Sequence, residues 1–286
     1  MQVHGEPWNQ YSLAANAAAY ALQAGPIMTS TRYLSVLAVF LILTCAPRPS
    51  FAQTPAAAAD APPLWDAQVG ASFVGTSGNS DTASTGADFS AHRRGMIWKL
   101  DAGATLVRTS TDGEATAERY LASFRADRRW TSRIGLTSGA KVERDRFAGL
   151  DLRSVLDGGL SWVLVQRPEW TLDGVSSIAW QHESRTTGVD VDDPIGVLQL
   201  LSRIPFGGQG DTTQRFTYYP NFKTASAYRY EAEITAQAAM TGHLALKIGY
   251  LLRFSNDPVP GFKNTDNTTT ASVVFRWKAA TPAPAP

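Results

Sequence analysis

The stretch YRYEAEITAQAAMTGHLALKIGYLLRF, residues 228–254, decides the fold class, because its side chains alternate between two kinds. From Tyr228 to Ala238 every even position is apolar, and every odd position is charged or polar. After a turn at residues 240–242, the apolar even positions resume from Leu244 to Phe254. Successive side chains of a strand point to opposite faces, so the stretch predicts a β-hairpin with one apolar and one polar face.

The same period of two recurs along the chain from Leu64 onward. It predicts twelve strands, at residues 65–75, 82–92, 97–108, 117–130, 133–146, 153–165, 169–182, 195–206, 211–219, 228–238, 244–254 and 268–277. Many of them are longer than common globular strands and are suited to crossing a membrane at a tilt, which takes about 9–11 residues. We therefore predict an all-β fold, an antiparallel transmembrane β-barrel over residues 64–277.

The two ends of the chain read differently from this body. Residues 28–52 resemble a secretory signal peptide, with one cation, a short apolar run and small residues before a cleavage point after Ala52. The apolar run is shorter than the roughly 20 residues that span a bilayer, so a retained anchor is the weaker reading, and a lipoprotein site at Cys45 is a poor one. We interpret residues 1–27 as an over-extended start, 53–63 as an Ala/Pro-rich flexible segment and 278–286 as an Ala/Pro-rich tail.

Composition adds little about partners. The chain has 26 Lys and Arg residues against 25 Asp and Glu residues, a net charge of +1, so no electrostatic signal points to a nucleic-acid partner and we expect none. A hydrophobic content of 44% fits a soluble domain and an outer-membrane barrel equally, because lipid-facing and lumen-facing residues alternate.

The connections between the expected strands are of two kinds. The turns at 92–95, 131–132, 166–168, 207–210 and 240–242 are short, whereas the opposite set at 76–81, 110–115, 184–193 and 256–267 is mostly longer. Short turns on the periplasmic side and longer loops outside are typical of outer-membrane barrels.

Six of the eight tryptophans fall on the apolar parity of their strands, at the end with the short turns. They are Trp65, Trp98, Trp130, Trp162, Trp170 and Trp277. The indole ring prefers the headgroup level, so we predict a periplasmic-side aromatic girdle in contact with outer-membrane lipid. Core tryptophans of a soluble sandwich are the alternative, but core burial would not sort them to one end.

Four stretches resemble a known family. VGTSGNSDTASTG (74–86), TAERYLASFRADRRW (116–130), ERDRFAGLDLR (143–153) and NTTTASVVFRW (267–277) are similar to the salt-induced outer-membrane proteins, a YdiY-like family of unknown function. The resemblance covers roughly residues 65–277 and implies an outer-membrane barrel, without catalytic residues to carry over. Such barrels usually end at an aromatic residue that the barrel assembly machinery reads. The tail 278–286 departs from this pattern, and we expect Trp277 to serve as an internal version of that signal.

The sequence gives little support for a catalytic site or a metal site. His92 and His243 lie at short turns, and His182 and Glu183 are strand neighbours that point to opposite faces. The acidic run 189–193 could hold calcium weakly, but is more often a solvated loop. The glycines of 207–210 precede no helix, so they are not a phosphate loop. We predict no catalytic residue, no metal and no cofactor.

Charges concentrate in VERDRFAGLDLRS, residues 142–154. A tight connection at 148–151 would place Asp145 opposite Arg153, Glu143 opposite Val155 and Lys141 opposite Asp157, while Arg119 would face Glu143 or Asp145. We predict that Arg119, Glu143, Asp145 and Arg153 form an ion-pair network in the lumen, under the extracellular rim. Independent solvated pairs worth about 0–1 kcal/mol each are the alternative.

Two classes of function follow. The first is a non-enzymatic outer-membrane barrel, either a narrow small-solute pore or a stress-related envelope component. The alternative is an outer-membrane enzyme that acts on lipid or lipopolysaccharide. A soluble lipocalin-like binder is a remoter reading, because the mixed-sign charges of the polar face do not suit an apolar ligand interior. Oligomeric state is left open.

Overall fold

The computed structural model describes residues 65–76, 82–206 and 210–278. These residues form the strands β1 (Trp65–Thr76), β2 (Thr82–Arg94), β3 (Trp98–Thr111), β4 (Glu114–Arg129), β5 (Ile134–Asp145), β6 (Leu150–Arg167), β7 (Trp170–Arg185), β8 (Asp190–Phe206), β9 (Gly210–Tyr219), β10 (Arg229–Ala239), β11 (Leu244–Ser255) and β12 (Thr265–Lys278). One 3-10 turn, η1 (Arg146–Ala148), joins β5 to β6. The segments 1–27, 28–52 and 53–63, and all of the tail except Lys278, lie outside the described residues.

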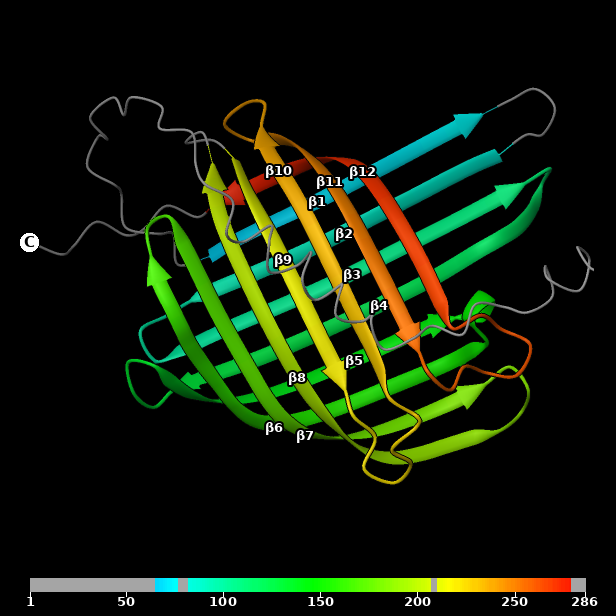
Figure 1. The fold of residues 1–286 in the computed structure, drawn as a ribbon. Coiled ribbons are helices and arrows are strands. Elements are labelled where there is room, and N and C mark those ends of the chain that lie inside the picture. Colours follow the sequence, from blue (N-terminus) through cyan, green and yellow to red (C-terminus); the bar gives the residue numbers. More distant parts are fainter. Residues whose placement is uncertain (1–64, 77–81, 207–209, 279–286) are drawn as a thin grey trace, which may run out of the picture. The chain divides into compact units, whose positions relative to one another are not determined.

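The sheet closes on itself. Each strand pairs antiparallel with its sequence neighbours, and β1 pairs with β12, for example Val69 opposite Phe275 (Figure 1). The predicted fold, a closed antiparallel barrel of twelve strands, is confirmed. Closure gives every strand two partners and leaves no free sheet edge, so backbone donors and acceptors are satisfied within the barrel wall.

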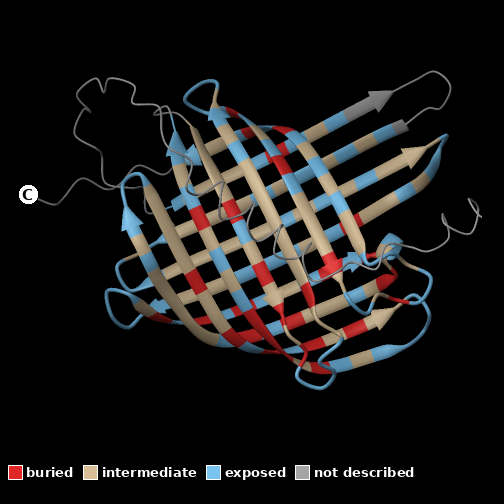
Figure 2. Cartoon of the chain, in the orientation of Figure 1, coloured by how far each residue is buried: buried red, intermediate tan, exposed pale blue. Residues whose placement is uncertain are grey.

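The alternation of the sequence becomes two different faces of the wall. Large apolar side chains of one parity stay exposed on the outside, such as Phe73 at 72%, Ile178 at 70% and Ile248 at 54% exposed. Side chains of the other parity are mostly buried or half-buried, and Figure 2 shows this alternation along the strands. An apolar outer surface on a closed wall is the inverse of a soluble protein's surface.

Two connections on the long-loop side are much shorter than we expected. The predicted loop over residues 110–115 is wrong, because β3 continues to Thr111 and β4 begins at Glu114. The prediction of a loop over residues 184–193 is wrong, because β7 continues to Arg185 and β8 begins at Asp190. The acidic run 189–193 therefore lies largely within β8, where Asp192 and Asp193 take part in cross-strand pairing with β7. Among the described residues no helix is long and apolar enough to cross a membrane.

Candidate functional site

Contacts between strands that are not neighbours identify the inner face of the barrel. Lys141 of β5 lies 2.8 Å, Nζ to Oε1, from Glu231 of β10, although several strands separate β5 from β10 in either direction around the wall. Lys247 of β11 and Asp88 of β2 make a similar contact at 3.2 Å. Such pairs can form only through the interior, so the polar parity of the sequence faces the lumen.

Glu143 of β5 is the centre of the charged interior, and it is only 1% exposed. Its Oε1 accepts hydrogen bonds from Arg119 Nε at 2.8 Å and from Arg253 Nη1 at 3.0 Å. Arg153 Nη1 lies 3.9 Å from its other carboxylate oxygen. These cations come from β4, β11 and β6, so one buried carboxylate ties together three strands besides its own.

Asp145 has two partners of different kinds. It accepts a hydrogen bond from Arg253 Nη2 at 2.7 Å, and its Oδ1 accepts another from the backbone N–H of Ala148 at 3.1 Å. The second bond caps the turn η1, after which Gly149 adopts a left-handed conformation with φ of 79°. Asp145 therefore both shapes the β5–β6 turn and anchors a side chain from the far wall.

The cluster continues along the wall to β7. Arg153 donates from Nη2 to Glu183 Oε2 at 2.6 Å, and Arg185 donates from Nε to the other oxygen of Glu183 at 2.7 Å. We call the luminal network the ion-paired residues Arg119, Lys141, Glu143, Asp145, Arg153, Glu183, Arg185, Glu231 and Arg253. It includes the four residues singled out in the sequence.

The prediction that Asp145 lies opposite Arg153 is wrong by two positions. Glu143 lies opposite Arg153, and Asp145 lies opposite Leu150. The turn comes earlier than expected, because η1 occupies residues 146–148, and a bulge between Glu143 and Asp145 sets three steps along β6 against two along β5. A shift of two keeps every side chain on the same face, so the charges still point inward.

The other expected pairs shift in the same way. Lys141 lies opposite Val155, and Asp157 lies opposite Gly139. Arg119 lies opposite Asp145, one of the two positions expected for it.

A second charged pair lies nearer the short turns. Arg125 of β4 donates two hydrogen bonds to Asp157 of β6, at 3.0 and 3.1 Å, over the intervening strand β5. Gly139 occupies the position between them, and a Cβ there would collide with the Asp157 carboxylate and the Arg125 guanidinium. The absence of a side chain at Gly139 lets the two charges meet.

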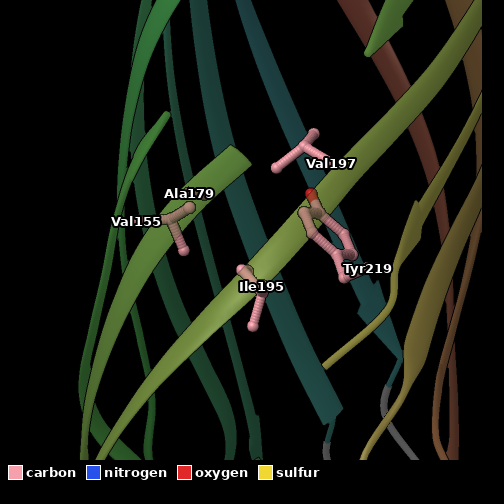
Figure 3. Packing of buried hydrophobic residues seen from close by; sticks show 5 residues of the cluster. All are labelled: Val155, Ala179, Ile195, Val197 and Tyr219. Atoms are coloured by element: carbon pink, nitrogen blue, oxygen red, sulfur yellow. The ribbon is translucent and has the colours of Figure 1, made fainter. Parts of the chain in front are cut away.

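The lumen also has an apolar patch that sequence reasoning missed. Val155, Ala179, Ile195, Val197 and Tyr219 pack on the inner wall from β6 to β9 (Figure 3). The run 194–201 is apolar at most positions of both parities, which is a signal that the inward positions of this strand segment are apolar as well.

The start of the connection between β9 and β10 continues the pairing with β8, with Ile195 opposite Asn221. Gly196 donates from its backbone N–H to Pro220, and Phe222 donates to Pro194. Asn221 Nδ2 also lies 2.6 Å from Asp193. These contacts hold the β9–β10 connection against the start of β8.

The loop between β11 and β12 reaches over the long-loop end. A Cβ on Gly149, in the β5–β6 turn, would collide with Val259 and with the ring of Phe262. Val259 is only 4% exposed. Since β5–β6 and β11–β12 lie on opposite sides of the closed sheet, this loop extends across the mouth.

The short-turn end holds a cavity instead. It has a volume of about 130 Å³ and is lined by both signs of charge, including Lys99, Asp101, Arg125, Asp127 and Asp173. The luminal network thus lies toward the long-loop end, and this cavity lies on its short-turn side.

The six tryptophans of the expected girdle lie at the short-turn end. Trp65, Trp98, Trp130 and Trp277 are 43–73% exposed. Trp162 and Trp170 are half-buried, and their indole N–H groups each donate at 3.1 Å to a serine of the next strand, Ser176 and Ser202. All six share the outward parity of the apolar residues.

The histidines make isolated contacts. His182 lies 2.9 Å from Asp192 at an exposed position of the outward parity, and His92 contacts Asp101 at 2.5 Å on the inner parity. Within residues 65–76, 82–206 and 210–278 no group of three or more His, Cys, Asp or Glu side chains could hold a metal ion.

Comparison with known proteins places this barrel in a family. The model of a protein family of unknown function, DUF481, matches residues 69–277. The chain belongs to this family. A further relative is the uncharacterized protein YdiY of Escherichia coli K12, 23% identical over 214 residues, which cover 74% of this chain and 82% of YdiY. The predicted membership of a YdiY-like family is confirmed.

Solved structures similar to this DUF481 chain include membrane barrels. The NanC porin has a TM-score of 0.45 and 12% identity, covering 76% of this chain and all of that one. An outer membrane channel from Pseudomonas putida F1 has a TM-score of 0.46 and 12% identity, covering 77% of this chain and 97% of that one. At such low scores these similarities assign no role to the chain.

Proposed function

We propose that the protein is an outer-membrane β-barrel that acts as a narrow channel for small solutes, constricted by the luminal network. The observation that carries the proposal is the pair of bridges from β5 to the far wall, Lys141 to Glu231 and Glu143 to Arg253. They cross the interior of a barrel whose inward face carries many charged and polar side chains.

The membrane location is supported by the outer surface. Large exposed apolar side chains occupy the outward positions of the strands, and a soluble protein rarely exposes a contiguous apolar surface of that extent. The tryptophans at the short-turn end suit the periplasmic headgroup level, which puts the longer loops outside the cell. Lipid of the outer membrane is then the partner of the whole outer face.

The constriction follows from the size and the filling of the barrel. Twelve strands enclose more space than the side-chain-filled interiors of eight-stranded barrels and less than the open channels of porins with sixteen. In this protein the charged side chains fill part of that space toward the long-loop end. Permeation would be limited to small solutes that can pass beside the bridges.

The function has a direct transport test. The protein is purified from outer membranes, where it should show heat-modifiable mobility in detergent gels, and is reconstituted into liposomes. We expect uptake of small sugars and amino acids, with a steep decline as solute size increases. A soluble periplasmic fraction would contradict the membrane location, and uptake no faster than in protein-free liposomes would contradict the channel.

A further inference from the structure

Arg229, the first residue of β10, is a buried cation that has no carboxylate partner within ion-pair distance in the part of the chain that the structure describes. It is 7% exposed. Its Nη2 donates to Gln181 Oε1 at 2.6 Å, and its guanidinium lies 3.9 Å from the centre of the Tyr219 ring. Its Nη1 has no hydrogen-bond partner among the described residues. A buried N–H of a charged group without a partner is costly, so the site calls for an acceptor.

The carboxylates near Arg229 are held by other cations. Glu231 and Glu143 attract it electrostatically, while Arg153 repels it. Glu231, however, is bound by Lys141 at 2.8 Å. Glu143 is bound by Arg119 and Arg253. Neither carboxylate is left to neutralise Arg229.

The whole cluster carries an excess of positive charge. With Arg229 the luminal network contains six cations and four carboxylates. The half-exposed Asp266, 3.8 Å from Arg253, adds a fifth carboxylate only at the margin. A buried group of charges is stable when it is paired, so this one favours a bound counter-ion.

We propose that Arg229 forms an anion-binding site in the lumen, which takes a small monovalent anion such as chloride at Nη1. Water could accept the hydrogen bond of Nη1, but only an anion also balances the excess charge and weakens the repulsion between Arg229 and Arg153. The aromatic face of Tyr219 on one side and Gln181 on another fix the guanidinium plane, so the free N–H has a defined direction. Insofar as the site sets the selectivity of a pore, it rests on the proposed channel function.

The binding test needs no conduction. The purified protein in detergent is unfolded by heat at constant pH and constant ionic strength, while sodium chloride is replaced stepwise by sodium gluconate, whose anion is too large for the site. A ligand that binds only the folded state raises the Tm with the logarithm of its concentration above the Kd. We expect the Tm of the wild type to rise by a few degrees for each tenfold increase in chloride.

Three variants test whether the chloride dependence of the Tm arises from Arg229. Arg229→Met should lose the chloride dependence, and Arg229→Lys, which keeps the charge, should retain part of it. Arg215→Met is the matched control, because Arg215 is a half-exposed luminal arginine already paired with Glu233 at 2.9 Å, and it should keep the full dependence. A wild-type Tm that is equal in chloride and gluconate would overturn the site. Full dependence in Arg229→Met would also overturn it. If that variant does not fold, Arg229→Lys decides: a reduced dependence supports the site, and a dependence as full as in the wild type and Arg215→Met would overturn it.

A second readout separates this site from the channel proposal. In planar bilayers under a potassium chloride gradient, the wild type should show a reversal potential on the anion-selective side, and Arg229→Met should shift it toward zero. Chloride-dependent stability without any conductance would refute the channel and leave the site standing. If the protein conducts but shows neither anion preference nor chloride-dependent stability, the site is refuted and the channel stands.

Discussion

Glu143 and Arg253 lie on β5 and β11, two strands on opposite sides of the closed sheet, and yet their side chains are 3.0 Å apart. Both side chains are nearly excluded from solvent, at 1% and 16% exposed. Their contact joins the two walls through the interior. Its removal should therefore affect both the stability of the barrel and the width of the lumen.

The ion pair between Asp145 and Arg253 should be strongly coupled. In a double-mutant cycle with Asp145→Ala and Arg253→Ala, we expect a coupling free energy of about 1–3 kcal/mol, because both groups are largely excluded from solvent and hydrogen-bonded. Arg203 and Asp211 serve as a control, since they form a more exposed pair at 3.2 Å, where about 0–1 kcal/mol is expected. Denaturant unfolding in lipid vesicles measures both cycles. Additive losses at the buried pair would show that its charges act independently.

The two parities of β11 should respond differently to polar substitution. Ile248 is 54% exposed on the outer face, and Ile248→Arg should cost about 2–4 kcal/mol in a lipid bilayer, because the charge lies near the midplane. Lys247→Gln, one residue away, should cost much less, because it stays in the polar lumen and loses only a half-buried pair with Asp88. Denaturant unfolding in lipid vesicles compares the two variants. Equal losses of unfolding free energy would mean that the lipid-facing and lumen-facing sides of β11 are misassigned.

Gly139 should not tolerate a methyl group. Gly139→Ala places a Cβ against the Asp157 carboxylate and the Arg125 guanidinium, and we expect a loss of about 1–3 kcal/mol as the pair is displaced. Gly158→Ala is the matched control, because its Cβ would meet nothing closer than 4.0 Å. That change should lie within about 0.5 kcal/mol of the wild type. If Gly139→Ala proved as neutral as Gly158→Ala, the contact between Arg125 and Asp157 across β5 would be contradicted.

The alternation of residues 228–254 was sufficient to predict the hairpin of β10 and β11, and its repetition predicted the number of strands. This worked because the two sides of a barrel wall are chemically opposite, so every strand carries the same pattern. The register of β5 and β6 was mispredicted, because an earlier 3-10 turn and a bulge in β6 together shift the pairing by two residues, and a shift of two does not change a period of two.

The far partner of the network could not be predicted. Arg253 is separated from Glu143 by 110 residues, and its approach depends on the closure and filling of the barrel rather than on any local spacing. Arg119 was predictable, because it lies on a strand that pairs directly with β5. The inward apolar patch around Ile195 was missed because a polar lumen was assumed along every strand.

Single-channel conductance in planar bilayers tests the constriction most directly, by comparing the wild type with Arg253→Ala, which removes the bridge from β11 to Glu143 and Asp145. Arg203→Ala, which alters a half-exposed luminal pair between the neighbouring strands β8 and β9, is the control. We predict small, uniform conductance steps for the wild type and the control, and clearly larger steps for Arg253→Ala. Equal conductance in all three, or conductance in none, would contradict a channel constricted by the luminal network.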